Sequence, residues 1–255
     1  MMSIHRAGDR YRGGDPDAGI ETRHAFSFGP HYDPDNLRFG ALIACNEERL
    51  APGAGFDEHP HSHTEIVTWV VEGELTHRDS AGHATLVRPG DVQHLCSAGG
   101  VRHVERNDGA EPLVFVQMWL APLEPGGEPS YEIVRGLADG APASYAVPAA
   151  GAVLHVRRPD AGERTAVPDG DLVYVHVVRG DVRLAVGGEA AGTPRSGDAE
   201  APGPPRAGSA DLSPAAGVDL SPGDAARVTD PRDVHLTALT PAEVLLWHMA
   251  HPGRR

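Results

Sequence analysis

Three histidines stand at every second position in one short stretch of the chain, His59, His61 and His63, and Glu65 continues the alternation. On a β-strand, residues i and i+2 point to the same face about 7 Å apart, whereas residues i and i+6 are roughly 20 Å apart. Imidazole and carboxylate groups are common ligands of transition metals. The spacing therefore allows His59 with His61, or His61 with His63, to share one ion, but it excludes all four residues as ligands of the same ion.

A second pair with the same spacing follows further along the chain. His103 and Glu105 begin twelve positions after Asp91, which ends a Pro-Gly-Asp turn. Two such residue pairs, each on one strand and each directing two nitrogen or oxygen atoms inward, can form a site of three histidines and one carboxylate. Such a site suits Fe(II), Mn(II), Ni(II), Cu(II) or Zn(II), with positions left for water, dioxygen or substrate.

The elements that would position these residues are short strands. Gly (31 residues) and Pro (23) are plentiful while aromatic residues make up 5%, which favours many turns between short strands over long helices. Evenly spaced strands of this kind are typical of a sandwich or a barrel. The predicted strands are Leu37–Asn46, Glu65–Val71, Glu74–Arg78, Ala84–Arg88, Val92–Ser97 and Leu113–Leu120.

The two halves of the chain repeat the same scheme. The segment VVEGEL (Val70–Leu75) resembles VVRGDV (Val177–Val182), and VRPGDV (Val87–Val92) resembles LSPGDA (Leu220–Ala225). The repeat predicts two similar β lobes.

The expected division places an N-terminal domain at residues 1–140 and a C-terminal domain at 150–250. The second repeat is the longer one because of a segment rich in Ala, Pro, Gly and Ser, which can bury little apolar surface. We expect a disordered insertion there, at about residues 188–219.

Composition and charge exclude several classes of protein. The 255 residues carry a formal net charge of −14 without a basic stripe, which argues against direct nucleic-acid binding. No apolar run approaches the length of a membrane span, and the N-terminus lacks an apolar signal-peptide core. Cys45 and Cys96 match no zinc spacing. We expect a reduced, cytoplasmic protein, monomeric by default.

The metal-ligand spacing resembles the two motifs of the cupin superfamily. A Gly, five residues, His-x-His, three residues and a Glu form the first motif, and Gly53, His59, His61 and Glu65 fit that count. The pair of His61 with His63 does not fit it. The Pro-Gly-Asp turn followed by His103 resembles the second motif.

The resemblance extends to a family within that superfamily. Three segments together resemble pirin and the bacterial pirin-like quercetin dioxygenases, and the similarity covers about residues 20–122. These segments are RHAFSFGPHYDP (Arg23–Pro34), GFDEHPHSHTEIVTWVVEGELTHRDSAGH (Gly55–His83) and RPGDVQHLCSAGGVRHVERN (Arg88–Asn107).

The resemblance implies an all-β bicupin, with two double-stranded β-helix (jelly-roll) lobes packed together and one metal ion in the first. The implied ligands are His59, His61, His103 and Glu105, and the implied ion is Fe(II), with Zn, Mn, Ni or Cu as other candidates. Glu65 then becomes a non-ligand that hydrogen-bonds near the site or within the strand network. His63 becomes a neighbour near the mouth of the site.

The sequence departs from the family pattern at three places. Ser62 stands where a bulky or basic residue is usual, Val104 replaces a common Ser, and the turn Ala98–Gly100 is one residue shorter. The shorter turn bears directly on how His103 approaches the metal ion.

In the second lobe, the positions equivalent to His59 and His61 are Ala166 and Pro168. His235 is near the place of the third ligand, and Thr237 replaces the carboxylate. We therefore expect no metal ion in that lobe.

The implied activity is flavonol 2,3-dioxygenation, in which a quercetin-like substrate reacts with O2 and releases carbon monoxide. Glu105 would be the catalytic base that accepts the proton of the 3-hydroxyl group. The alternative is a non-enzymatic, metal-bound regulator or redox sensor that acts through a protein partner. His24, His31, His94, Met118 and Trp119 are interpreted as structural or rim residues.

Overall fold

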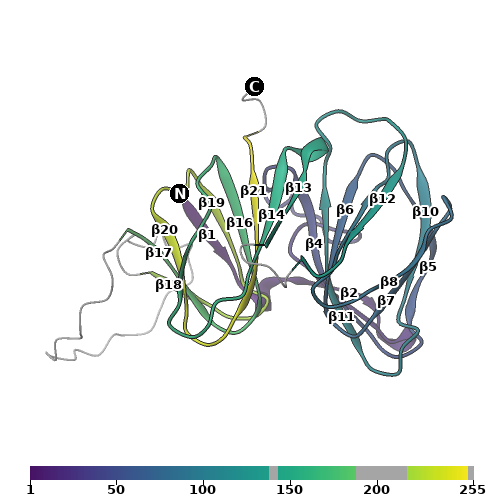
Figure 1. Cartoon of the computed structure of the whole chain (residues 1–255), viewed down its shortest axis with the longest axis horizontal. Coiled ribbons are helices and arrows are strands. Elements are labelled where there is room, and N and C mark those ends of the chain that lie inside the picture. The colour runs from purple at the N-terminus through teal and green to yellow at the C-terminus, as the bar shows by residue number, and fades with distance from the viewer. Residues whose placement is uncertain (138–142, 188–216, 252–255) are drawn as a thin grey trace, which may run out of the picture.

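The computed structural model describes residues 1–137, 143–187 and 217–251. These residues form two β lobes that lie side by side, with three short 3-10 helices at Ala7–Asp9, Pro16–Ala18 and Pro148–Ala150 (Figure 1). The predicted all-β bicupin architecture is confirmed.

The first lobe consists of a seven-stranded sheet facing a four-stranded sheet. The large sheet has the order β12-β9-β6-β11-β4-β3-β2, and the small sheet has the order β5-β10-β7-β8. In chain order the strands are β2 (Tyr11–Asp15), β3 (Ile20–His24), β4 (Leu42–Leu50), β5 (Gly55–His61), β6 (Glu65–Glu72), β7 (Leu75–Asp79), β8 (Ala84–Val87), β9 (Val92–Cys96), β10 (Val101–Arg106), β11 (Leu113–Leu120) and β12 (Ser130–Val134).

The second lobe repeats this arrangement with a six-stranded and a four-stranded sheet. Their orders are β1-β19-β16-β21-β14-β13 and β15-β20-β17-β18. The strands are β1 (Met2–His5), β13 (Ala143–Val147), β14 (Ala152–Arg157), β15 (Arg164–Ala166), β16 (Leu172–Arg179), β17 (Val182–Val186), β18 (Val218–Leu220), β19 (Ala225–Thr229), β20 (Val234–Ala238) and β21 (Glu243–Met249).

The repeated glycines occupy equivalent turns in the two lobes. Gly73 and Gly180 have φ angles of 78° and 70°, in the left-handed region that favours glycine. A Cβ atom would lie 2.7 Å from the Pro112 carbonyl oxygen at Gly73, and 2.2 Å from that of Pro241 at Gly180. Both turns therefore require glycine for the same two reasons, which explains why the VVEGEL and VVRGDV segments are alike.

The N-terminal strand belongs to the second lobe. β1 pairs antiparallel with β19, at the sheet position that β12 occupies in the first lobe. In Figure 1 the N-terminus accordingly lies in the lobe that carries the C-terminal strands. This strand departs from the expected assignment of residues 1–140 to one domain.

The other boundaries also differ from the expected ones. β13 lies in the sheet of the second lobe ahead of residue 150. Most of the insertion expected at about residues 188–219 falls outside the described residues. Its predicted end is too late, because Val218 and Asp219 belong to β18 and pair with Leu184 and Arg183.

The large sheets of the two lobes pack against each other through a shared core. Trp69, Met118, Tyr174 and Trp247 are buried there. The Trp247 indole N–H donates to the Met118 sulfur at 3.0 Å. Burial on this scale favours a fixed arrangement of the lobes, because each large side chain removes apolar surface from water.

Most predicted strands are confirmed within one residue at each end, and one is shifted. The strand expected at Leu37–Asn46 begins at Leu42 and continues to Leu50. Phe39 and Leu42 exchange backbone hydrogen bonds of 2.9 and 3.0 Å around Gly40, whose φ is 59°. The apolar residues before Leu42 therefore form a tight turn instead of an extended strand.

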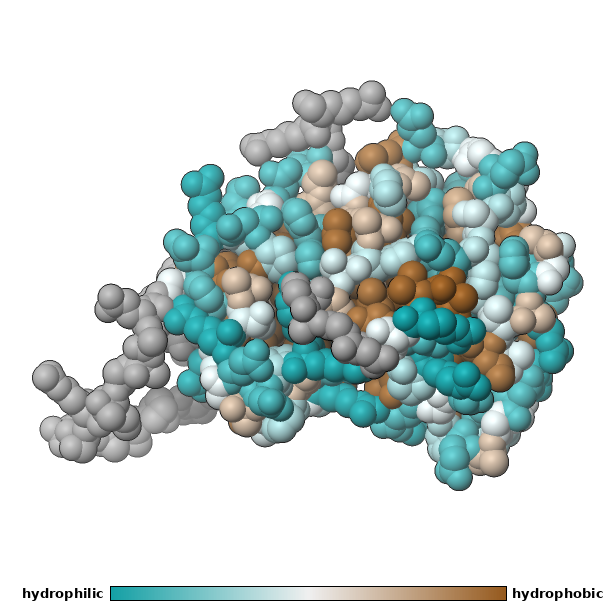
Figure 2. Space-filling view, in the orientation of Figure 1, coloured by the Kyte–Doolittle hydropathy of each residue, from teal (hydrophilic) through white to brown (hydrophobic). Residues whose placement is uncertain are grey.

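The face of the molecule in Figure 2 is mainly hydrophilic, with hydrophobic residues gathered near the middle of the view. This distribution agrees with the net charge of −14, which a solvated acidic surface can carry. In the described part of the chain, no helix is long and apolar enough to cross a membrane.

Candidate metal centre

The candidate ligands lie on two neighbouring strands of the small sheet in the first lobe. β5 and β10 pair antiparallel, and His59 stands directly opposite His103. The register shifts between His103 and Glu105, since Glu105 is paired with Phe56. This irregularity is a β-bulge, which changes the direction of side chains locally. The pairing explains how residues far apart in the sequence meet at one site.

Three imidazole rings converge at this position. The Nε2 atoms of His59 and His103 are 2.9 Å apart. The ring centroids are separated by 4.9 Å between His59 and His61, 4.5 Å between His59 and His103, and 4.8 Å between His61 and His103. One ligand atom from each of the three residues lies within 4.8 Å of the other two. An ion at this centre would thus be in reach of all three.

The hydrogen bonds of these rings leave nitrogen atoms available. His59 Nδ1 lies 2.7 Å from the Asp57 carbonyl oxygen, which can only accept, so Nδ1 carries the proton and Nε2 keeps its lone pair. His61 Nε2 and His103 Nδ1 are buried without a hydrogen-bond partner. Buried polar atoms are rarely left unpaired. The donor set and the unpaired His61 Nε2 therefore fit a bound transition-metal ion.

The electrostatic environment also favours the neutral form of His61 and His103. Burial, together with the nearby imidazoles of His103 and His59, lowers the pKa of His61 to about 4. Burial likewise lowers the pKa of His103, against the opposing effect of Glu105. A neutral imidazole is the form that coordinates a metal.

Glu105 is buried beside the three imidazoles and has a different partner. Its Oε2 lies 4.0 Å from His103 Nε2. The Gln117 amide nitrogen donates to both carboxylate oxygens, at 3.0 Å to Oε1 and 2.7 Å to Oε2. Glu105 also forms a second cluster of potential ligands with His77 and His103. The carboxylate is thus close to the three-imidazole group without being part of it.

Comparisons with known proteins agree on one family. The family model described as Pirin matches residues 7–120. A putative quercetin 2,3-dioxygenase of Mycobacterium tuberculosis is 36% identical over 97% of this chain and 95% of its own length. A pirin-like protein of Caulobacter vibrioides is 31% identical over 92% of this chain and 94% of its own length. The chain belongs to the pirin family.

A solved pirin has the same fold. The crystal structure of the bacterial pirin YhhW of Escherichia coli in complex with nickel(II) aligns with a TM-score of 0.77 and 26% identity. The alignment covers 98% of this chain and all of that one. The resemblance to pirin that the first lobe predicts is therefore confirmed, and the structural match extends it to both lobes.

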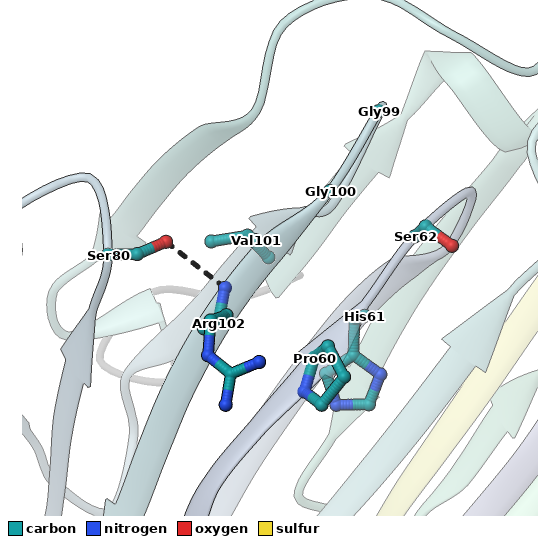
Figure 3. Close-up of a pocket in the computed structure, with 8 residues that line it drawn as sticks. All are labelled: Pro60, His61, Ser62, Ser80, Gly99, Gly100, Val101 and Arg102. Atoms are coloured by element: carbon teal, nitrogen blue, oxygen red, sulfur yellow. Dashed lines mark hydrogen bonds between the residues drawn. The ribbon is translucent and has the colours of Figure 1, made fainter.

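The ends of β5 and β10 border a cavity next to His61. This cavity of about 390 Å³ is lined by residues of both strands and of the loops beside them. Figure 3 shows His61 and Ser62 on one strand end, Gly99–Arg102 on the other, and Ser80 across from them. His61 is both a candidate ligand and a lining residue, whereas His59, His103 and Glu105 do not line this cavity, so the cavity borders the candidate centre only at His61.

The shortened turn before His103 still brings His103 to the centre. Ala98 has a φ of 39° and accepts a hydrogen bond from the His63 backbone N–H at 2.8 Å. Gly100 N–H donates to the Ser97 carbonyl oxygen at 2.8 Å. These bonds close the turn, and His103 reaches His59 despite the missing residue.

His63 and Glu65 lie away from the three imidazoles. His63 is exposed beyond the end of β5, with a φ of 56°. Glu65 is buried and accepts from His94 Nε2 at 2.7 Å, and the other His94 nitrogen lies 2.8 Å from the Tyr145 hydroxyl of the second lobe. Of the two roles expected for Glu65, the structure shows the strand network.

Three further residues surround the centre: His77 and Gln117, which the sequence did not single out, and Trp119, which it indicated to be a structural or rim residue. His77 is fully buried, and its ring lies 5.4 Å from that of His103 and stacks on Tyr131 at 4.8 Å. Gln117 donates a hydrogen bond to Glu105. The Trp119 and His61 rings lie edge to face, with their centroids 4.8 Å apart. The alternation along Leu113–Leu120 was a usable signal for the last two, because Gln117 and Trp119 share a face opposite the core residue Met118.

The second lobe keeps one histidine, His235, at the corresponding ladder. Ala166 of β15 stands opposite His235 of β20, as His59 stands opposite His103. Thr237 faces Arg164 on the same pair of strands. Among the described residues, the potential metal clusters all belong to the first lobe. The pairing of Ala166 with His235 agrees with the position count made from the sequence.

Proposed function

We propose that this pirin is a metal-dependent dioxygenase that cleaves the ring of a flavonol such as quercetin with O2 and releases carbon monoxide. The observation that carries the proposal is the convergence of His59, His61 and His103, with a buried carboxylate, Glu105, beside them. The relative in M. tuberculosis that is named a putative quercetin 2,3-dioxygenase supports the substrate class.

In this proposal the ligands are His59, His61, His103 and Glu105, and the preferred ion is Fe(II). Three nitrogen donors and one carboxylate also accept Mn(II), Ni(II), Cu(II) or Zn(II). When bound, the ion supplies the positive charge and redox chemistry that allow a deprotonated flavonol to react with O2.

Glu105 would accept the proton of the flavonol 3-hydroxyl group. Its side chain is 1% exposed, so the carboxylate is shielded from water and stays directed toward the centre. In the overall reaction, the two atoms of O2 end on C2 and C4 of the flavonol and C3 leaves as carbon monoxide, which balances all atoms.

The rim of the site suits a flat aromatic molecule. Trp119 stands edge-on to His61 at 4.8 Å and to Phe28 at 5.1 Å. Aromatic rings favour edge-to-face and offset contacts with other rings. A flavonol that enters beside His61 would meet this apolar wall while its 3-hydroxyl group faces Glu105.

The test is turnover of quercetin by protein loaded separately with each first-row divalent metal. The expected result is loss of the flavonol absorbance in air with the Fe(II)-loaded protein and none with metal-free protein. Absence of turnover with every metal would contradict the proposal and favour the alternative, a metal-bound regulator with a protein partner.

A further inference from the structure

Gln117 reaches Glu105 from the facing sheet of the first lobe. Gln117 lies on β11 of the large sheet, whereas Glu105 lies on β10 of the small sheet. The amide nitrogen donates to both carboxylate oxygens, and the two side chains are 6% and 1% exposed. A buried carboxylate needs such donors, because an unpaired buried charge is costly.

Trp119 fixes which end of the Gln117 amide faces Glu105. The Trp119 indole N–H donates to Gln117 Oε1 at 3.0 Å. An indole nitrogen can only donate, so the amide oxygen must face Trp119 and the amide nitrogen must face Glu105. A reversed amide would place N–H against N–H and oxygen against the carboxylate. The indole therefore selects the orientation that holds Glu105.

We propose that Gln117 and Trp119 are positioning residues for the metal centre. Gln117 holds the Glu105 carboxylate in one orientation beside the three imidazoles. Trp119 keeps the Gln117 amide in the orientation that donates to Glu105, through its indole N–H. This inference rests on the proposed function, since it assigns the two residues a role at the same centre. The Trp119 ring also contacts His61, so this side chain touches one candidate ligand directly and acts on Glu105 through Gln117.

The test compares the affinity for Ni(II) alone, measured by competition with a chelating dye. Gln117→Leu is expected to weaken Ni(II) binding about 10–100-fold, the usual cost of losing a residue that supports a metal ligand. Trp119→Phe keeps a ring against His61 but removes the N–H. We expect it to weaken binding about 2–10-fold, as for one lost hydrogen bond.

A double-mutant cycle separates positioning from a general structural effect. In a Glu105→Gln background, Gln117→Leu should cause little further loss, because its effect passes through Glu105. Gln93→Leu is the matched control. Gln93 is fully buried in the same sheet; its amide nitrogen donates to Thr68 at 3.4 Å and its amide oxygen accepts from the Tyr131 hydroxyl at 3.1 Å, so its own hydrogen bonds go to neither Glu105 nor an imidazole of the centre. Its replacement should leave the Ni(II) affinity within about two-fold of that of the unchanged protein.

The outcomes distinguish this inference from the proposed function. Absence of Ni(II) binding by the unchanged protein would overturn both. Normal binding that Gln117→Leu leaves unchanged, or weakens equally in the Glu105→Gln background, would overturn the positioning role alone. If Gln117→Leu does not fold, the Trp119→Phe variant, which changes a half-buried residue, serves as the test. An unchanged Ni(II) affinity of Trp119→Phe would then overturn the positioning role.

Discussion

His59 and His103 face each other across the β5–β10 ladder with their Nε2 atoms 2.9 Å apart. Two unprotonated nitrogens at this distance repel each other unless a proton or a cation lies between them. Since His61 Nε2 is also buried without a partner, a metal ion can satisfy all three rings at once.

Loss of one of these histidines should abolish tight metal binding. We expect His103→Ala to reduce Ni(II) or Fe(II) affinity at least about 100-fold, because one of three nitrogen donors disappears. Metal content of the purified protein and dye competition measure the effect. His63→Ala is the control, since that exposed residue lies outside the cluster. Equal losses in both variants would contradict the assignment.

Glu105→Gln should separate catalysis from metal retention. The amide keeps the size of the side chain but cannot accept the substrate proton, so kcat with quercetin should fall about 10²–10⁴-fold. The affinity for the metal should fall about as much as in Gln117→Leu, but with metal in excess the content per chain should stay above half of that of the unchanged protein, because the three imidazoles remain. A variant with normal kcat would exclude Glu105 as the base.

Glu48 should make stability depend on pH. Burial, and to a smaller extent the charge of Glu105, raises the pKa of Glu48 to about 8, although the Thr22 hydroxyl donates to it. A raised pKa in the folded state means that stability is full below the unfolded pKa and declines as pH rises through the folded one. Between pH 4.5 and 8 this loss is of the order of 5 kcal/mol.

The measurement is urea unfolding of the unchanged protein and of Glu48→Gln from pH 5 to pH 9. The substitution removes the titrating group while keeping its size and polarity. The free energy of unfolding should fall with pH more steeply in the unchanged protein. Parallel curves for the two proteins would show that Glu48 is not protonated when folded.

Asp224 should anchor the N-terminal segment to the second lobe. Its carboxylate accepts from the Ala7 N–H at 2.8 Å, from Arg6 at 2.6 Å and from the Ser221 N–H at 3.1 Å. Loss of three hydrogen bonds at about 1 kcal/mol each predicts that Asp224→Ala lowers the free energy of unfolding by about 2–3 kcal/mol.

Chemical denaturation measures this effect, and Asp219→Ala is the control. Asp219 pairs with Arg183 at an exposed position, where ion pairs contribute little. Hydrogen exchange of the β19 amides should also speed up in Asp224→Ala, because β1 holds that edge of the sheet. Equal stability of the two variants would contradict the anchoring role.

The period of a β-strand was sufficient to find the candidate residue pairs, and the resemblance to the cupin motifs and to pirin selected His59, His61, His103 and Glu105 among them. The period could not place Glu65, since the turn at His63 interrupts the alternation between β5 and β6. The alternation of side chains along β5 therefore does not predict where Glu65 points. Glu65 instead forms a hydrogen bond with His94, whose other ring nitrogen contacts the Tyr145 hydroxyl of the second lobe.

Long-range pairing was the other limit. Nothing in the short segment Met2–His5 indicates that it pairs with β19, because sheet partners distant in sequence leave no local pattern. Gln117 and Trp119 were visible only as residues of a predicted strand. Their role depends on Glu105 lying across the barrel, which the order of the sequence does not reveal.

The most direct test of the proposed function is the amount of carbon monoxide released per O2 consumed by the Fe(II)-loaded protein with quercetin. We expect one carbon monoxide for each O2, and neither carbon monoxide release nor O2 uptake above background with His59→Ala. Consumption of O2 without carbon monoxide, or an unchanged reaction in His59→Ala, would contradict a flavonol dioxygenase at this centre.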